Sequence, residues 1–210
     1  MDFFDLREPL SAWTHFTGLV MAIPGTFILW RRSRGDRTGK RLSLLVFGLC
    51  LTSCYAASTL YHGLHLPPDR LAIFDRLDRI GIFLLIAGSY TPLAWCLLRG
   101  VWRRATLVSV WLVAAVASTL LALGLPLPTP LGTGLYLAMG WGSIACYAEL
   151  ARVVSHRDLW LLLFGGLLYS VGALFNLLRW PVLRPGLFRA HQLFHVFVLA
   201  GSLAHFWLIL

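Results

Sequence analysis

Two pairs of polar residues, each spaced four apart, stand out in a chain that is otherwise strongly apolar. Ser58 and His62 form one pair, and His191 and His195 form the other. Residues i and i+4 of an α-helix project from the same face, so His191 and His195 can direct two imidazole rings at one ion. His62 can supply a third nitrogen from another helix. Three histidines with a fourth position left open for water are typical of catalytic zinc sites, and imidazole suits zinc well.

A carboxylate and a hydroxyl are expected near the same ion. Asp78 precedes an apolar run that begins near Ile80, and we expect it to hydrogen-bond the water or to orient a ligand. Ser58, one turn before His62, is placed to reach the same water or a substrate carbonyl. The His-x-x-x-His spacing alone is weak, because seven histidines in 210 residues give about 0.2 such pairs by chance. The combination of groups favours a functional site over histidines that only lie at headgroup level.

The composition indicates lipid, and not water, as the solvent of this chain. Hydrophobic residues make up 58% of the sequence and charged residues 13%, about half the share found in soluble domains. The net charge of +9 would suit a nucleic-acid partner, but the basic residues form short clusters between apolar runs. Membrane proteins set their orientation with such clusters. We therefore expect membrane lipids, and no nucleic acid, as partners.

Seven apolar runs are each long enough for a bilayer-spanning helix of about 20 residues. Runs this long and uniform favour helices over barrel strands, which alternate in polarity over about 10 residues. We predict an all-α membrane protein in which residues 1–210 form a single domain, a seven-helix transmembrane bundle. The predicted spans are residues 10–30, 42–62, 80–98, 105–124, 135–154, 159–178 and 190–210.

Alternation of these spans places the polar residues on one side of the membrane. The second span ends, and the third and seventh begin, on the side of the N-terminus. Lysine and arginine number 7 on this side and 11 on the other. The seven are Arg7, Arg70, Arg76, Arg79, Arg179, Arg184 and Arg189. The positive-inside rule then places the N-terminus and the polar site on the outer side of the cell membrane.

Other polar residues have a plainer interpretation. His15 lies deeper in the first predicted span, where it either lines the site or only packs, and Asn176 in the sixth span is similar. All four cysteines fall inside apolar runs, so we expect buried thiols and not disulfides in loops. They are Cys50, Cys54, Cys96 and Cys146.

Three stretches of the chain resemble the hemolysin III family, within the wider progestin and adipoQ receptor superfamily. They are residues 58–62 (Ser-Thr-Leu-Tyr-His), residues 77–92 (beginning Leu-Asp-Arg-Ile-Gly) and residues 191–205 (beginning His-Gln-Leu-Phe-His). Glu8-Pro9 followed by His15 also resembles the family's opening, and the resemblance covers essentially the whole chain.

The resemblance implies roles for the same polar residues. In receptor relatives of known structure, the matching histidines bind zinc and the matching aspartate contacts the zinc-bound water. It therefore implies His62, His191 and His195 as ligands, with Asp78 beside them. The chain departs from the pattern at Arg79, where similar proteins often have histidine. The receptor relatives also place the N-terminus and the metal in the cytosol, opposite to the charge count here.

Three functions are compatible with this pattern. The first is a zinc-dependent hydrolase of lipid-like amides or esters, with Asp78 as general base and Ser58 as a partner of the water or oxyanion. The similarity of the receptor relatives to alkaline ceramidases points the same way. The second is a pore-forming cytolysin or channel with a structural or regulatory metal, as the family name implies. Polar groups clustered on one side argue against a monomeric pore, but an oligomer stays open. The third is a membrane receptor, which would have only short loops for signalling.

Overall fold

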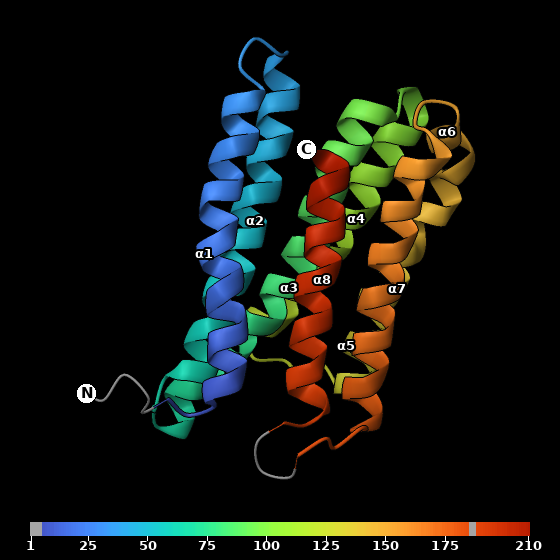
Figure 1. Cartoon of the computed structure of the whole chain (residues 1–210). Helices are drawn as coiled ribbons and strands as arrows, with labels where there is room; N and C mark the ends of the chain where they lie inside the picture. The colour runs from blue at the N-terminus through green and yellow to red at the C-terminus, as the bar shows by residue number, and fades with distance from the viewer. Residues whose placement is uncertain (1–5, 185–187) are drawn as a thin grey trace.

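The computed structural model describes residues 6–184 and 188–210, which fold into helices joined by short turns (Figure 1). Within these residues, six helices are long and apolar enough to cross a membrane. They are α1 (Pro9–Arg32), α2 (Thr38–Gly63), α3 (Pro68–Leu97), α4 (Gly100–Ala122), α7 (His156–Leu178) and α8 (Ala190–Ile209). The prediction of an all-α, multi-pass membrane protein is confirmed.

The segment between α4 and α7 is broken into three pieces, where the sequence predicted one continuous span over residues 135–154. These are α5 (Thr129–Trp141), the 3-10 helix η1 (Gly142–Cys146) and α6 (Tyr147–Ala151). In Figure 1, α5 lies towards the lower end of the bundle and α6 at the upper end, so the segment still runs along the bundle. Gly140 and Gly142 weaken the helix at this point. The Tyr90 hydroxyl lies 2.8 Å from the carbonyl oxygens of both Met139 and Gly140, and so it supplies a polar partner at the break.

Helix α3 begins at Pro68, well before the predicted start at residue 80. The sequence analysis assigned Pro67-Pro68 and the charges that follow to a connection between spans. Proline is favoured at the first position of a helix, however, and Asp69 in the first turn interacts favourably with the helix dipole. Asp78 consequently lies inside α3, about three turns after its start, and not at its mouth.

Helix α3 also joins the three hydrophobic clusters of the core. Leu85 packs with residues of α1, α2 and α8, Phe83 and Ala87 pack with α4 and α5, and Leu93 and Ala94 pack against α6 and α7. The four cysteines are free thiols, of which Cys54 and Cys146 are buried. These clusters hold the inner faces of α1, α2, α3, α7 and α8 around one interior.

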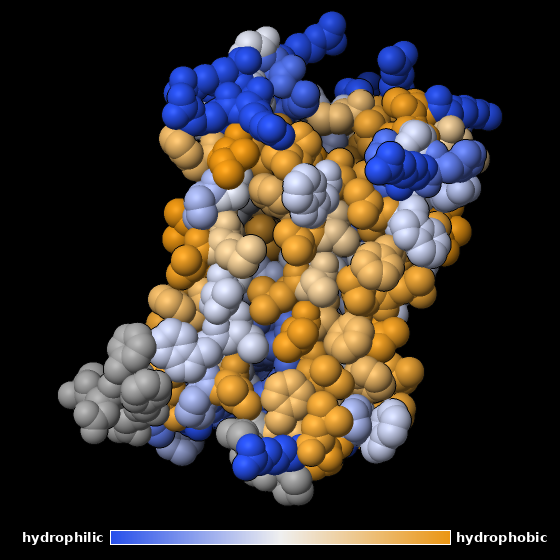
Figure 2. All heavy atoms as spheres, viewed as in Figure 1, coloured by the Kyte–Doolittle hydropathy of each residue, from blue (hydrophilic) through white to orange (hydrophobic). Residues whose placement is uncertain are grey.

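The surface follows the expected pattern for a chain in a bilayer. Figure 2 shows hydrophobic residues over the middle of the visible face and hydrophilic residues gathered at the upper end. The turn between α1 and α2 belongs to that end and carries the largest group of basic residues. There Lys40 pairs with Asp36 at 2.9 Å, and the Arg41 guanidinium lies 4.2 Å from the centre of the Trp30 ring.

Close packing of α2 on α3 depends on a residue without a side chain. A Cβ added at Gly88 would lie 2.6 Å from the Cys50 Cβ and 2.9 Å from its Sγ. We therefore predict that Gly88→Ala destabilises the bundle by about 1–3 kcal/mol, because it forces the two helices apart. Thermal unfolding in detergent measures the effect. Gly134→Ala in α5 is the matched control, since nothing lies within 4 Å of its added Cβ. An unchanged midpoint for Gly88→Ala would contradict this account of the packing.

Candidate metal site

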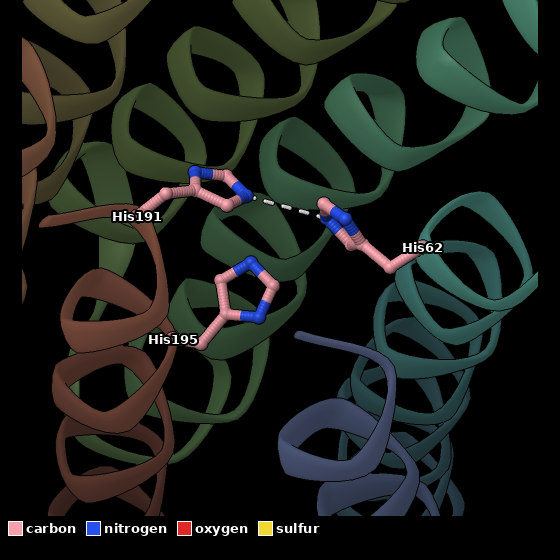
Figure 3. A group of neighbouring side chains, drawn as sticks. All are labelled: His62, His191 and His195. Carbon is pink, nitrogen blue, oxygen red and sulfur yellow. Dashed lines mark hydrogen bonds between the residues drawn. The ribbon is translucent and has the colours of Figure 1, made fainter. Parts of the chain in front are cut away.

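Three histidine rings from two helices meet near the lower end of the bundle. His62 comes from the last turn of α2, and His191 and His195 come from the first two turns of α8. One nitrogen of each ring lies within 4.8 Å of the others. His62 and His195 are each only 1% exposed, and His191 is half-buried. Figure 3 shows the three rings turned towards a common centre. The group is therefore able to hold a metal ion.

The Nδ1 atom of each ring faces a hydrogen-bond acceptor from another helix or from the chain just before α1. His62 Nδ1 lies 2.8 Å from Glu8 Oε2, and His191 Nδ1 lies 3.1 Å from Asn176 Oδ1. His195 Nδ1 lies 3.3 Å from the Ser11 carbonyl oxygen and 3.2 Å from Thr14 Oγ1. In the tautomer with the proton on Nδ1, each ring donates to its acceptor and leaves Nε2 as a free electron-pair donor. Carboxylates and carbonyls hold metal-binding histidines in this way in other proteins.

The spacing of the His62 and His191 Nε2 atoms fits a metal ion. His62 Nε2 and His191 Nε2 are 3.3 Å apart (Figure 3). Zinc–nitrogen bonds of about 2.0–2.1 Å in a tetrahedral site would separate two ligand atoms by roughly 3.3–3.4 Å. Two Nε2 atoms that both lack a proton cannot hydrogen-bond each other, and their lone pairs repel. A cation between them removes this repulsion, so the cluster is able to hold a metal ion.

The two other predicted site residues lie beside the histidines. Asp78 Oδ2 is 3.9 Å from His62 Nε2. This is too far for a direct hydrogen bond but close enough for a bridging water molecule. Ser58 is 1% exposed, and its hydroxyl lies beside the Asp78 carboxylate. The structure thus brings all five predicted residues together, while their roles as ligands or catalytic groups stay predictions.

A cavity of about 880 Å³ adjoins the cluster. The three histidines, Asp78 and Ser58 line one part of it, and its walls continue along α3, α5, α7 and α8. Most of the lining surface is apolar, and the residues that provide it include Ile82, Leu85, Ile86, Leu93, Leu162 and Val198. A concave, mostly apolar space with a few polar groups at one place is typical of a ligand site.

Sequence reasoning missed Glu8, which has the closest contact with a histidine of the cluster. Glu8 directly precedes α1 and also pairs with Arg7 at 2.9 Å. The hydrogen bond from His62 holds the pKa of the Glu8 carboxyl below its ordinary value, against the opposing effect of partial burial. The carboxylate is therefore ionised at neutral pH. Its position immediately before the first span, on the side of the histidines, was the available signal.

The fold and the cluster together define a multi-pass helical membrane protein with a buried three-histidine centre. The model of the haemolysin-III related family matches residues 4–206, so the chain belongs to this family. Over 208 residues it is 33% identical to Hemolysin-3 of Bacillus cereus, covering 99% of this chain and 92% of that protein. It is 32% identical to a Hemolysin-3 homolog of Bacillus subtilis, with 99% and 95% covered. It is also 27% identical to the adiponectin receptor protein of Drosophila melanogaster, covering 95% of this chain and 49% of that protein.

Removal of the Glu8 carboxylate should weaken metal binding without removing a ligand. We predict that Glu8→Ala lowers zinc affinity about 10–100-fold, because His62 loses the acceptor that orients its ring. Competition against a chromogenic chelator measures the affinity. Asp36→Ala is the matched control, since that carboxylate pairs with Lys40 in the turn between α1 and α2. Equal affinities for both variants and the wild-type chain would show that Glu8 does not orient the ring.

Proposed function

We propose that this protein is a zinc-dependent hydrolase of lipid-like amides or esters. The observation that supports the proposal most strongly is the convergence of three histidine ring nitrogens on the wall of a large, mostly apolar cavity. Sites built only for structural zinc are usually closed by four protein ligands. Within the described residues the cluster has three, so one position is left for chemistry.

His62, His191 and His195 would hold the ion through Nε2. Zinc in such a site supplies a Lewis acid that polarises a carbonyl group and makes water more acidic. The carboxylate of Glu8 and the amide oxygen of Asn176 would keep two of the rings in the binding orientation. All-imidazole coordination favours zinc over calcium and magnesium, which prefer oxygen ligands.

Asp78 would act as the general base, and Ser58 would bind the carbonyl side of the substrate. Asp78 is close enough to the cluster to accept the proton from an attacking water and to pass it to the leaving amine or alcohol. The Ser58 hydroxyl lines the cavity beside Asp78, where it would donate a hydrogen bond to an oxyanion. Addition of water across the C–N or C–O bond then yields a carboxylic acid and an amine or alcohol.

The substrate would be a membrane lipid or a molecule that partitions into the membrane. The apolar walls along α3, α5, α7 and α8 suit a hydrocarbon chain, while the polar residues bind the group that is cleaved. The cluster lies at the end of the bundle with 7 lysines and arginines, against 11 at the other end. We therefore also propose that the N-terminus and the site face the outer side of the cell membrane.

Activity should depend on the metal and on Asp78 separately. We predict that His191→Ala loses both metal and hydrolysis, whereas Asp78→Asn keeps the metal and lowers kcat about 10²–10⁴-fold, because only the proton transfer is lost. Amine release from N-acyl lipids in proteoliposomes is the measurement. Glu149→Gln is the control, since Glu149 forms an exposed pair with Arg152 at 2.6 Å and should leave the rate unchanged.

Two outcomes would overturn the proposal. Metal-loaded wild-type protein that hydrolyses neither amide nor ester lipids would exclude the hydrolase and leave a structural or regulatory metal. In intact cells, a chelator that does not cross membranes should abolish activity from outside. Inhibition only after the cells are opened would reverse the proposed orientation.

A further inference from the structure

His15 is a buried polar ring without a hydrogen-bond partner. It lies on α1, is 4% exposed, and neither Nδ1 nor Nε2 has a partner among the described residues. The backbone and side-chain polar groups of a membrane interior have no bulk water to compensate for a missing bond. An unpaired buried polar group is destabilising, and most such groups in proteins have a partner. The two nitrogens of His15 therefore call for an explanation.

Packing alone does not explain the choice of histidine at this position. The His15 ring stacks on His195 with centroids 3.8 Å apart and planes inclined by 13°. Its other neighbour is Tyr55, at 5.2 Å and 63°. A phenylalanine ring would make the same stacked and edge contacts and would bury no unpaired nitrogen. The nitrogen atoms are what distinguish histidine here.

His15 lines the same cavity as Asp78, Ser58 and the three-histidine cluster. A polar side chain beside the metal cluster, in a cavity whose other walls are mostly apolar, is placed to meet a polar atom of the occupant. Neutral imidazole offers one N–H donor and one acceptor, which matches the carbonyl and N–H of a secondary amide.

We propose that His15 hydrogen-bonds the polar group of an amphipathic molecule bound in this cavity, with a secondary amide as the best match. It then determines which ligands the cavity accepts and is not a further metal ligand. The choice of an amide rests on the proposed function, but the contact itself concerns binding. The proposed hydrogen bond from His15 does not depend on whether the bound molecule is cleaved.

The test compares two photoprobes that share one diazirine-bearing alkyl chain. One probe ends in a secondary amide and the other in a methyl group. Photolabelling of the full chain in lipid nanodiscs gives the apparent affinity for each probe, and it does not require the protein to hydrolyse the probe. Wild-type protein should bind the amide probe more tightly. His15→Phe should lower affinity for the amide probe about tenfold and leave the methyl probe and the metal content within about twofold of wild type. His15→Gln should recover part of the loss.

Tyr55→Phe is the matched control. It removes a buried hydroxyl from the ring that packs on His15, but Tyr55 does not line the cavity, so neither probe should change. Equal binding of the amide probe by wild type and His15→Phe would reduce His15 to a packing residue and overturn the proposal. A parallel loss of both probes, or loss of metal in His15→Phe, would assign it a structural role and also overturn it. Loss of hydrolysis with unchanged probe binding would contradict this inference without touching the proposed enzyme.

Discussion

Polar groups inside a membrane protein must find partners within the protein, and the histidine cluster satisfies this requirement in a specific way. Each Nδ1 of His62, His191 and His195 is engaged by a different acceptor, so each Nε2 points its lone pair inward. Three such lone pairs in close proximity repel one another in the absence of a cation. The arrangement is therefore that of a site able to hold a metal ion, with Asp78 and Ser58 beside it on the cavity wall.

The fold supplies the partners from separate parts of the chain. Glu8 precedes α1, the Ser11 carbonyl belongs to α1, and Asn176 lies near the end of α7. Because the rings themselves come from α2 and α8, four helices must be in place before all three can be oriented. Helix α3 lies among these elements, contributes to all three hydrophobic clusters and brings Asp78 to the rings. The same helix supplies Tyr90 to the break between α5 and η1, which leaves Trp141 and Ser143 on the cavity wall.

Much of this site could be predicted from sequence. Spacing of four puts His191 and His195 on one helix face, and alternation of the spans puts His62 and Asp78 on the same side. The hydrogen-bond partners of the three Nδ1 atoms were harder to predict from the sequence. The contact of His195 with Ser11 uses a backbone carbonyl oxygen, which every residue type has, so the sequence does not indicate it. Asn176 contacts His191 only because α7 packs on α8.

The errors in the helix boundaries also have physical causes. Pro67-Pro68 and the charges that follow are typical of a connection, yet they also suit the start of a helix that extends beyond the apolar zone. The break after Trp141 depends partly on a hydroxyl that is about 50 residues away in sequence, since Tyr90 and Gly140 are separated by that interval. Glycines are common in membrane helices, so Gly140 and Gly142 alone did not indicate a break.

Metal analysis tests the central claim most directly. Protein purified from metal-replete cells without chelators should contain one zinc per chain by mass spectrometry of the elements. The double variant His191→Ala/His195→Ala should contain none while it keeps its helical content. Wild-type protein free of metal, or a double variant that retains it, would contradict the account of this cluster as a metal centre.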